Sequence, residues 1–211
     1  MKGLKGLAAA AMVSAAVLLA GCGSNTMLEE YSFGYVQLKA GNSEVYVMTP
    51  FDLAHVNRQD GEGMMYINND KHINVVAVSE TAGETTPVAM ADKYVAMLKQ
   101  TPDVSDLQTK ITEAEESGRK ATVVDASYTE PLNGQPAKLT VRSFFFEDNG
   151  QIWHVMYMYK DGDELAKEVV DHVFWPAKVI FKTTRKRVKF HDRIGCKLRK
   201  LIFEVSARQH G

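Results

Sequence analysis

Histidine side chains are the first groups in this chain that could bind a metal or transfer a proton. The chain has six of them, at the scattered positions His55, His72, His154, His172, His191 and His210. None stands four residues from another, so the usual spacing of a zinc site does not occur. His154 alternates with apolar residues, and we expect it to be a packed, hydrogen-bonded core residue rather than a ligand.

Carboxylate pairs could act as general acid and base, and two acidic groups fit that description. These are Glu113, Glu115 and Glu116 at the end of one strand-like run, and Asp161, Asp163 and Glu164 at the start of a helix-like one. Asp161 and Glu164 have capping-box spacing, so helix capping explains the second group, and we expect both groups to be solvated. No Gly-x-Ser-x-Gly, P-loop or dinucleotide fingerprint occurs. The sequence predicts no catalytic, cofactor-binding or metal-ligating residue, and no enzyme.

Cys22 is the one residue whose surroundings indicate a covalent modification. Lys2 and Lys5 precede an apolar run over residues 7–19, which has the length of a signal h-region and is short for a membrane span. The following Leu19-Ala20-Gly21-Cys22 resembles a bacterial lipobox. That resemblance implies cleavage before Cys22, diacylglycerol on its sulfur and an acyl chain such as palmitate on its amino group. The alternative is a plain secretory signal with a chance cysteine.

Cys196, the other cysteine, has no intramolecular partner if Cys22 carries lipid. We therefore expect a lipoprotein of the bacterial cell envelope, held to a membrane by lipid, with its domain on the extracytoplasmic side. Its partner is expected to be an envelope protein of unknown identity.

Charge divides the chain unevenly. Residues 22–176 contain 12 Lys and Arg against 24 Asp and Glu, whereas residues 177–211 contain 11 against 2. The acidic excess of the longer part argues against nucleic-acid binding. The change after Trp175-Pro176 predicts a domain edge. We assign 1–21 to a signal peptide, 22–31 to a lipidated tether, 32–176 to the domain and 177–211 to a basic extension outside it.

The basic extension allows two interpretations. Apolar residues spaced among its bases could form one side of a helix on anionic lipid; they are Val188, Ile194, Leu198 and Leu201. Alternatively it is an unpacked extension, which we favour because the domain already closes with a helix near Phe174. Truncation after Pro176 should then leave the thermal stability nearly unchanged.

The elements that must position these residues follow from periodicity. Strands are expected over residues 31–40, 44–48, 64–67 and 72–79, and a helix begins at Pro87 behind the N-cap Thr86. Four further runs, over 107–115, 119–130, 138–146 and 151–160, predict an antiparallel meander. Asn133-Gly134 and Asn149-Gly150 join the later ones, because Asn-Gly is the strongest short hairpin signal. A closing helix carries Leu165, Val169 and Val173 on one face.

The run 151–160 is apolar on both faces, so it must be covered on both. We expect the helices to cover one face. The aromatic side, with Trp153, Tyr157 and Tyr159, is then either partly open to a partner or covered by loops or by the first strands. These rings, together with Phe144, Phe145 and Phe146, could stack on bases or sugars, but we expect them to fill a core.

The order of strands, helix, meander and closing helix resembles the PsbP/Mog-type α/β sandwich and, within it, the bacterial DcrB-like lipoproteins. The resemblance covers roughly residues 43–174. It is carried by Pro50-Phe51, by Ala91-Asp92-Lys93-Tyr94, by Gly118-Arg119-Lys120-Ala121 and by Ser143–Phe146 followed by Gln151-Ile152-Trp153. It implies an α+β fold, an antiparallel sheet packed with two main helices, and a non-enzymatic envelope or assembly factor.

A lipid-anchored binding or assembly module is therefore the function that we expect. A carrier of a small apolar ligand, held between sheet and helices, is the alternative. An envelope hydrolase is less favoured, because it would need a nucleophile and an oriented base in one cleft.

Overall fold

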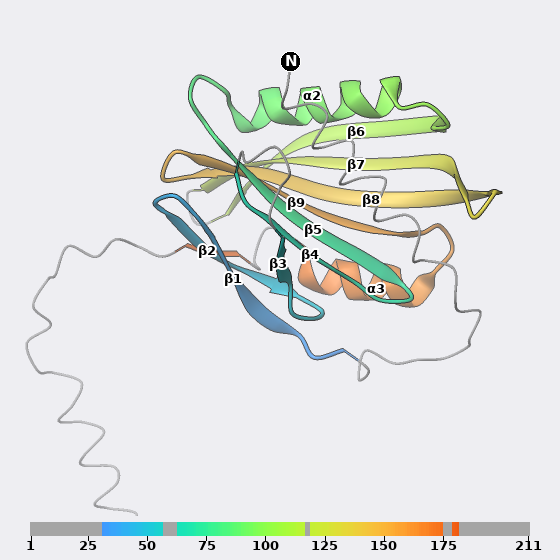
Figure 1. Cartoon of the computed structure of the whole chain (residues 1–211), viewed down its shortest axis with the longest axis horizontal. Coiled ribbons are helices and arrows are strands. Elements are labelled where there is room, and N and C mark those ends of the chain that lie inside the picture. The colour runs from blue at the N-terminus through green and yellow to red at the C-terminus, as the bar shows by residue number, and fades with distance from the viewer. Residues whose placement is uncertain (1–30, 57–62, 117–118, 175–178, 182–211) are drawn as a thin grey trace, which may run out of the picture. The chain divides into compact units, whose positions relative to one another are not determined.

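Antiparallel strands make up most of the part of the chain that the structure describes, as the sequence predicts. The computed structural model describes residues 31–56, 63–116, 119–174 and 179–181 (Figure 1). Its elements are β1 (Gly34–Ala40), β2 (Ser43–Thr49), β3 (Ala54–Val56), β4 (Met65–Asn69), β5 (Ile73–Thr81), α2 (Pro87–Gln100), β6 (Ser105–Glu116), β7 (Arg119–Leu132), β8 (Gln135–Asp148), β9 (Gln151–Lys160), α3 (Glu164–Val173) and β10 (Val179–Phe181).

A seven-stranded sheet forms the centre of the fold, in the order β3-β4-β5-β9-β8-β7-β6. Every neighbouring pair is antiparallel, so the meander from β6 to β9 is confirmed. Both Asn-Gly turns have positive φ at both residues: 48° and 76° at Asn133 and Gly134, and 49° and 76° at Asn149 and Gly150. Two-residue hairpins of this kind require positive φ at both turn residues, and Asn and Gly adopt positive φ more readily than other residues. β5 pairs with β9 and so joins the early strands to the meander.

Helix α2 covers one face of this sheet. Its apolar stripe, including Tyr94, Val95 and Leu98, is buried against residues such as Val124 and Met156 of the sheet. Thr86 caps the helix as predicted, because its side chain accepts a hydrogen bond from the backbone N–H of Ala89 at 3.2 Å.

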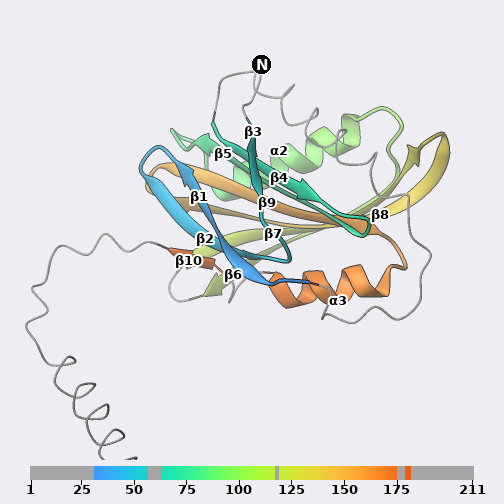
Figure 2. The same ribbon diagram turned by 60° about the horizontal axis from the view of Figure 1, so that its bottom comes forward.

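The opposite face is covered by α3 together with a three-stranded sheet of order β1-β2-β10. Figure 2 shows α2 and α3 on opposite sides of the large sheet. The expectation that both helices share one face is therefore wrong, and so is an open aromatic side. Trp153, Tyr157 and Tyr159 are buried beneath α3 and the first strands. The prediction that the aromatic rings fill a core is confirmed.

The N-cap of helix α3 lies two residues after the one that the sequence predicts. Asp163, rather than Asp161, is its N-cap, and the Asp163 carboxylate accepts from the backbone N–H of Ala166 at 3.0 Å. Asp161 instead pairs with Lys138 at 3.0 Å and accepts from Thr140 at 3.3 Å. The capping-box spacing from Asp161 to Glu164 was misleading because the intervening Gly162 adopts a φ of 83° and delays the helix.

Strand β10 lies past residue 176, where the sequence analysis placed the end of the domain. It pairs with β2, and the Phe181 ring meets Phe146 edge to face at 5.4 Å between centroids. The Arg119 guanidinium also stacks on the Phe181 ring, 4.1 Å from its centroid. The part of the chain that contributes to the fold therefore reaches Phe181. A run of three residues is too short for periodicity to reveal it.

Candidate functional site

The predicted lipidation site, Cys22, lies outside the described residues, as do Cys196, His191, His210 and the apolar residues of the basic extension. The structure therefore tests only the predictions about histidines and carboxylates that lie within the described residues. In the part of the chain that is described, no group of three or more His, Cys, Asp or Glu could hold a metal ion. None of the described helices is long and apolar enough to cross a membrane.

His154 is packed as predicted, beneath α2. Its ring stacks on Phe145 with 4.0 Å between centroids and meets Tyr94 edge-on at 4.8 Å. Burial lowers the pKa of His154 to about 3, so the ring is neutral at physiological pH. Its Nε2 atom has no hydrogen-bond partner among the described residues.

Three further polar side chains lie near His154 on the same face. The Tyr94 hydroxyl donates to the sulfur of Met156 at 3.4 Å, and the Tyr128 hydroxyl donates to the sulfur of Met158 at 3.6 Å. Burial raises the pKa of both hydroxyls and of the Glu130 carboxyl. Thioether sulfur is a weak acceptor, so these hydroxyls are poorly matched to their surroundings.

His72 forms the contact that most resembles catalytic machinery. Its Nδ1 lies 2.7 Å from the Asp163 carboxylate, 91 residues away in sequence. A histidine oriented by a carboxylate is two thirds of a hydrolase triad. However, Asp163 also caps α3, and Asp70 holds the backbone N–H groups of His72 and Ile73 at 2.8 and 2.7 Å. No described Ser, Thr or Cys side chain is hydrogen-bonded to His72 or Asp163, so the pair fastens the β4–β5 turn to α3.

A second polar network lies at the other end of the sheet, around the buried carboxylate of Asp148. Ser43 of β2 donates to Asp148 at 2.9 Å, and the Trp153 indole donates to Ser43 at 2.8 Å. Arg119 and Asn149 also donate to this carboxylate, at 3.2 and 3.1 Å. Asp148 is only 3% exposed, so these donors replace the water that it loses. The network fixes the β1–β2 hairpin on the large sheet.

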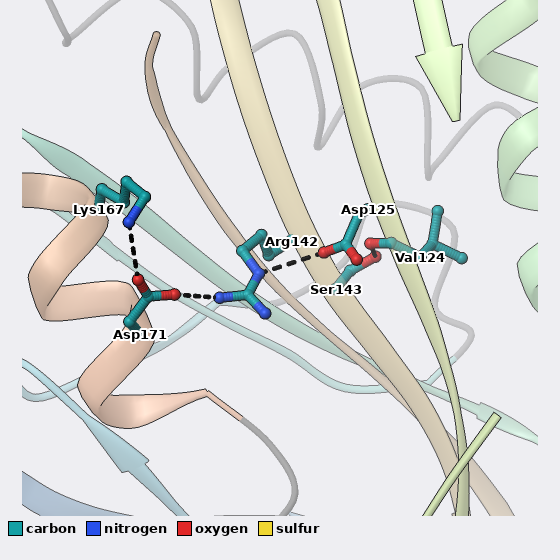
Figure 3. A network of polar contacts seen from close by, with 6 residues as sticks. All are labelled: Val124, Asp125, Arg142, Ser143, Lys167 and Asp171. Atoms are coloured by element: carbon teal, nitrogen blue, oxygen red, sulfur yellow. Dashed lines mark hydrogen bonds and ion pairs between the residues drawn. The ribbon is translucent and has the colours of Figure 1, made fainter. Parts of the chain in front are cut away.

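Arg142 connects β8 to its neighbours on the α3 side (Figure 3). Its Nε donates to Asp125 of β7 at 3.1 Å, and its Nη1 pairs with Asp171 of α3. Lys167 binds the same Asp171 carboxylate at 3.2 Å. The Arg142 guanidinium also stacks on Phe174, 4.1 Å from the ring centroid. This set of contacts holds the end of α3 against the sheet.

Neither of the two predicted acidic groups forms a catalytic arrangement with the histidines or with Asp148 and Arg142. Asp161 and Asp163 serve the contacts described above, and Glu164 is exposed in the first turn of α3. Glu113 and Glu115 are exposed near the end of β6, in agreement with the expectation of solvated charge, while the Glu116 side chain lies outside the described set. Sequence reasoning missed the Asp148 and His72 contacts because their partners are distant along the chain.

Comparisons with known proteins add limited information. No protein-family model and no curated protein matches the chain. One similar solved structure is LpqN of Mycobacterium tuberculosis, which is described as involved in cell envelope biogenesis. Its sequence is 14% identical, the match covers 76% of this chain and 99% of LpqN, and the TM-score is 0.40. A cyanobacterial PsbP from Synechocystis shares 11% identity, with 78% and 99% covered and a TM-score of 0.44.

A Pseudomonas aeruginosa protein of unknown function, described as a putative regulator, shares 10% identity, with 67% and 96% covered and a TM-score of 0.40. At such identities and scores the likeness is one of general arrangement and carries no argument about activity. The α+β sandwich itself follows from the sheets and helices described above. The narrower resemblance to DcrB-like lipoproteins stays a prediction.

Proposed function

We propose that this chain is a lipid-anchored, non-enzymatic binding or assembly module of a bacterial cell envelope. The strongest support is the sequence Leu19-Ala20-Gly21-Cys22 behind the apolar run 7–19. A short tether then leads to β1, which begins at Gly34. Eleven residues lie between Cys22 and Gly34, and an extended chain spans at most about 3.5 Å per residue, so a lipid on Cys22 would keep the start of β1 within roughly 40 Å of the membrane.

The polar contacts of the domain support a role without catalysis. His72, Asp148 and Arg142 each lie where two elements of the fold meet, and each holds those elements together. A catalytic site needs a nucleophile, an oriented base and room for substrate at one place. The best oriented histidine and carboxylate among the described residues are His72 and Asp163, and this pair attaches α3 to the β4–β5 turn.

The anchoring is tested by comparing the two cysteines of the chain. Mass spectrometry of the mature protein should find Cys22 at the new N-terminus with diacylglycerol and an amide-linked acyl chain. Cys22→Ala should abolish this modification and release the domain from membranes, whereas Cys196→Ala should leave both unchanged. An unmodified Cys22, or cleavage elsewhere, would contradict the lipoprotein assignment.

The binding role is tested in cells and with purified protein. Crosslinking in intact cells, followed by mass spectrometry, should recover an envelope protein. The purified domain should show no hydrolysis of generic ester, peptide or glycoside substrates. Turnover that is lost in His72→Asn while the circular dichroism spectrum is unchanged would overturn the non-enzymatic assignment.

A carrier of a small apolar ligand is the second candidate, and the polar atoms beneath α2 would bind a hydrogen-bonding group at one end of that ligand. Glu130 Oε1 and His154 Nε2 are buried without a described partner, and the nearby tyrosine hydroxyls have only sulfur acceptors. Native mass spectrometry of the protein purified from membranes should then reveal a bound small molecule. Its loss in Glu130→Ala, but not in Glu147→Ala at an exposed site on β8, would support the carrier.

A further inference from the structure

The two edges of the seven-stranded sheet differ in length. One edge is β3, which has only three residues, and the other is β6, which has twelve. No described strand pairs with the outer side of β6, which lies at the margin of the sheet in Figure 1. An edge strand presents a row of backbone N–H and C=O groups that can pair with another chain. β6 is therefore the longer open template in the described part of this sheet.

The side chains of β6 give this edge a particular chemistry. Ile111 lies opposite Val124, which belongs to the α2 face, so Thr109, Ile111, Glu113 and Glu115 all lie on that side of β6. Ile111 is 40% exposed, so its apolar side chain is accessible beside the edge of β6 that no described strand covers. Glu113 and Glu115 are exposed, and neither forms an ion pair with another described residue.

We propose that the outer edge of β6 binds an extended segment of another protein by β-strand addition. The segment would place an apolar residue beside Ile111 and basic residues, at alternate positions, beside Glu113 and Glu115. Backbone hydrogen bonds supply affinity in this mode, and the alternating side chains supply specificity. This inference rests on the proposed role as a binding module and gives that module its recognition surface.

A second copy of this chain fits the edge less well than a basic segment does. Antiparallel pairing of two copies through the acidic half of β6 sets Glu113 and Glu115 beside the same carboxylates of the partner copy, and like charges directly opposite are destabilising. The register shift between Ser105 and Gln108 also interrupts the regular edge at its other end. A basic segment meets opposite charge instead, over the regular part from Gln108 to Glu116.

The test uses the full mature chain in detergent and a fluorescent peptide of alternating valine and lysine, about eight residues long to match the regular part of β6. Fluorescence anisotropy should show saturable binding. A peptide of the same sequence with alternate backbone nitrogens methylated should fail to bind, because it cannot donate hydrogen bonds along one edge. Binding should protect alternate backbone amides of β6 from hydrogen exchange, with no change in α2 or α3.

Charge reversal supplies the matched control. Glu113→Lys combined with Glu115→Lys should weaken peptide binding about tenfold, because two attractive contacts become repulsive. Glu164→Lys combined with Glu168→Lys makes the same change in net charge on the exposed side of α3 and should leave binding unchanged. All four side chains are exposed, so both variants should fold.

Several outcomes would overturn the assignment of β6. Equal weakening by both pairs would show general charge attraction, and protection of amides elsewhere would show a different surface. Dimerisation of the chain that is lost in Ile111→Lys would show that a second copy occupies the edge. Failure of peptide binding, while Cys22 is acylated and in-cell crosslinks persist, would reject β6 as the recognition surface and leave the lipid-anchored module standing.

Discussion

The two faces of the seven-stranded sheet are covered by different kinds of contact. On the α2 face, the helix is attached through apolar packing, and the hydroxyls of Tyr94 and Tyr128 find only methionine sulfur. On the α3 face, apolar packing is supplemented by directed contacts of His72, Asp148 and Arg142. The difference shows that the elements on the α3 face are held in a fixed orientation by polar contacts as well as by burial of apolar side chains.

Geometry explains the difference. Among the described residues the three-stranded sheet has no strand pairing with the large sheet, so apolar burial alone would leave its angle and position loosely specified. Hydrogen bonds have strict distance and angle requirements, and Ser43, Trp153 and Asp148 impose them at the contact between the two sheets. The contacts of His72 and Arg142 hold α3 itself, which has 10 residues against 14 in α2 and therefore a shorter stripe of side chains to fix its position.

Acid should disturb the α2 face most. The folded pKa of His154 is about 3, below its ordinary value of 6.5, so between these values the unfolded chain binds more protons. The contribution of neutral His154 to the free energy of unfolding is therefore fully present above about pH 6.5. Below that pH, the free energy of unfolding should fall by roughly 1.4 kcal/mol for each pH unit. Urea unfolding at several pH values measures this slope. In His154→Phe, which keeps the ring stack, the slope should become shallower, and an unchanged slope would contradict the assignment.

Removal of β10 should weaken the α3 face by a smaller amount. A chain that ends after Pro176 loses the contacts of Phe181 with Phe146 and Arg119, and we expect about 2–3 kcal/mol less stability. A chain that ends after Phe181 is the control and should keep the stability of the full chain. Thermal unfolding of the two truncations measures the difference. Equal melting temperatures would restore the earlier boundary at residue 176.

The two helix caps provide a matched pair across the sheet. Thr86→Ala removes only the cap of α2 and should cost about 1 kcal/mol. Asp163→Ala removes the cap of α3 and also leaves the buried His72 without its partner, so about 2 kcal/mol is expected. Chemical denaturation of both variants gives the comparison. Equal losses would mean that the contact with His72 contributes nothing to the attachment of α3.

The ion pairs of Asp171 should contribute least to stability, because they are partly solvated. Arg142→Met keeps much of the contact with Phe174 but loses Asp125 and Asp171, and about 1 kcal/mol is expected. Lys167→Met removes one exposed ion pair of the same carboxylate and should change stability by less than about 0.5 kcal/mol. Urea unfolding distinguishes the two variants, and a larger loss for Lys167→Met would contradict this ranking.

The sequence by itself determined the local structure of this protein. Strand periodicity, the Asn-Gly turns and the cap at Thr86 depend on residues that are close together in the chain, so they could be recognised without the fold. Only the tertiary structure decided which face each helix covers, because a strand that is apolar on both sides accepts a helix on either. The β5–β9 pairing and the contacts of His72 with Asp163 and of Ser43 with Asp148 were likewise undetermined. The side-chain contacts join residues about 90 or more positions apart, and α2 with β6, β7 and β8 separates β5 from β9 along the chain. No local pattern carries that information.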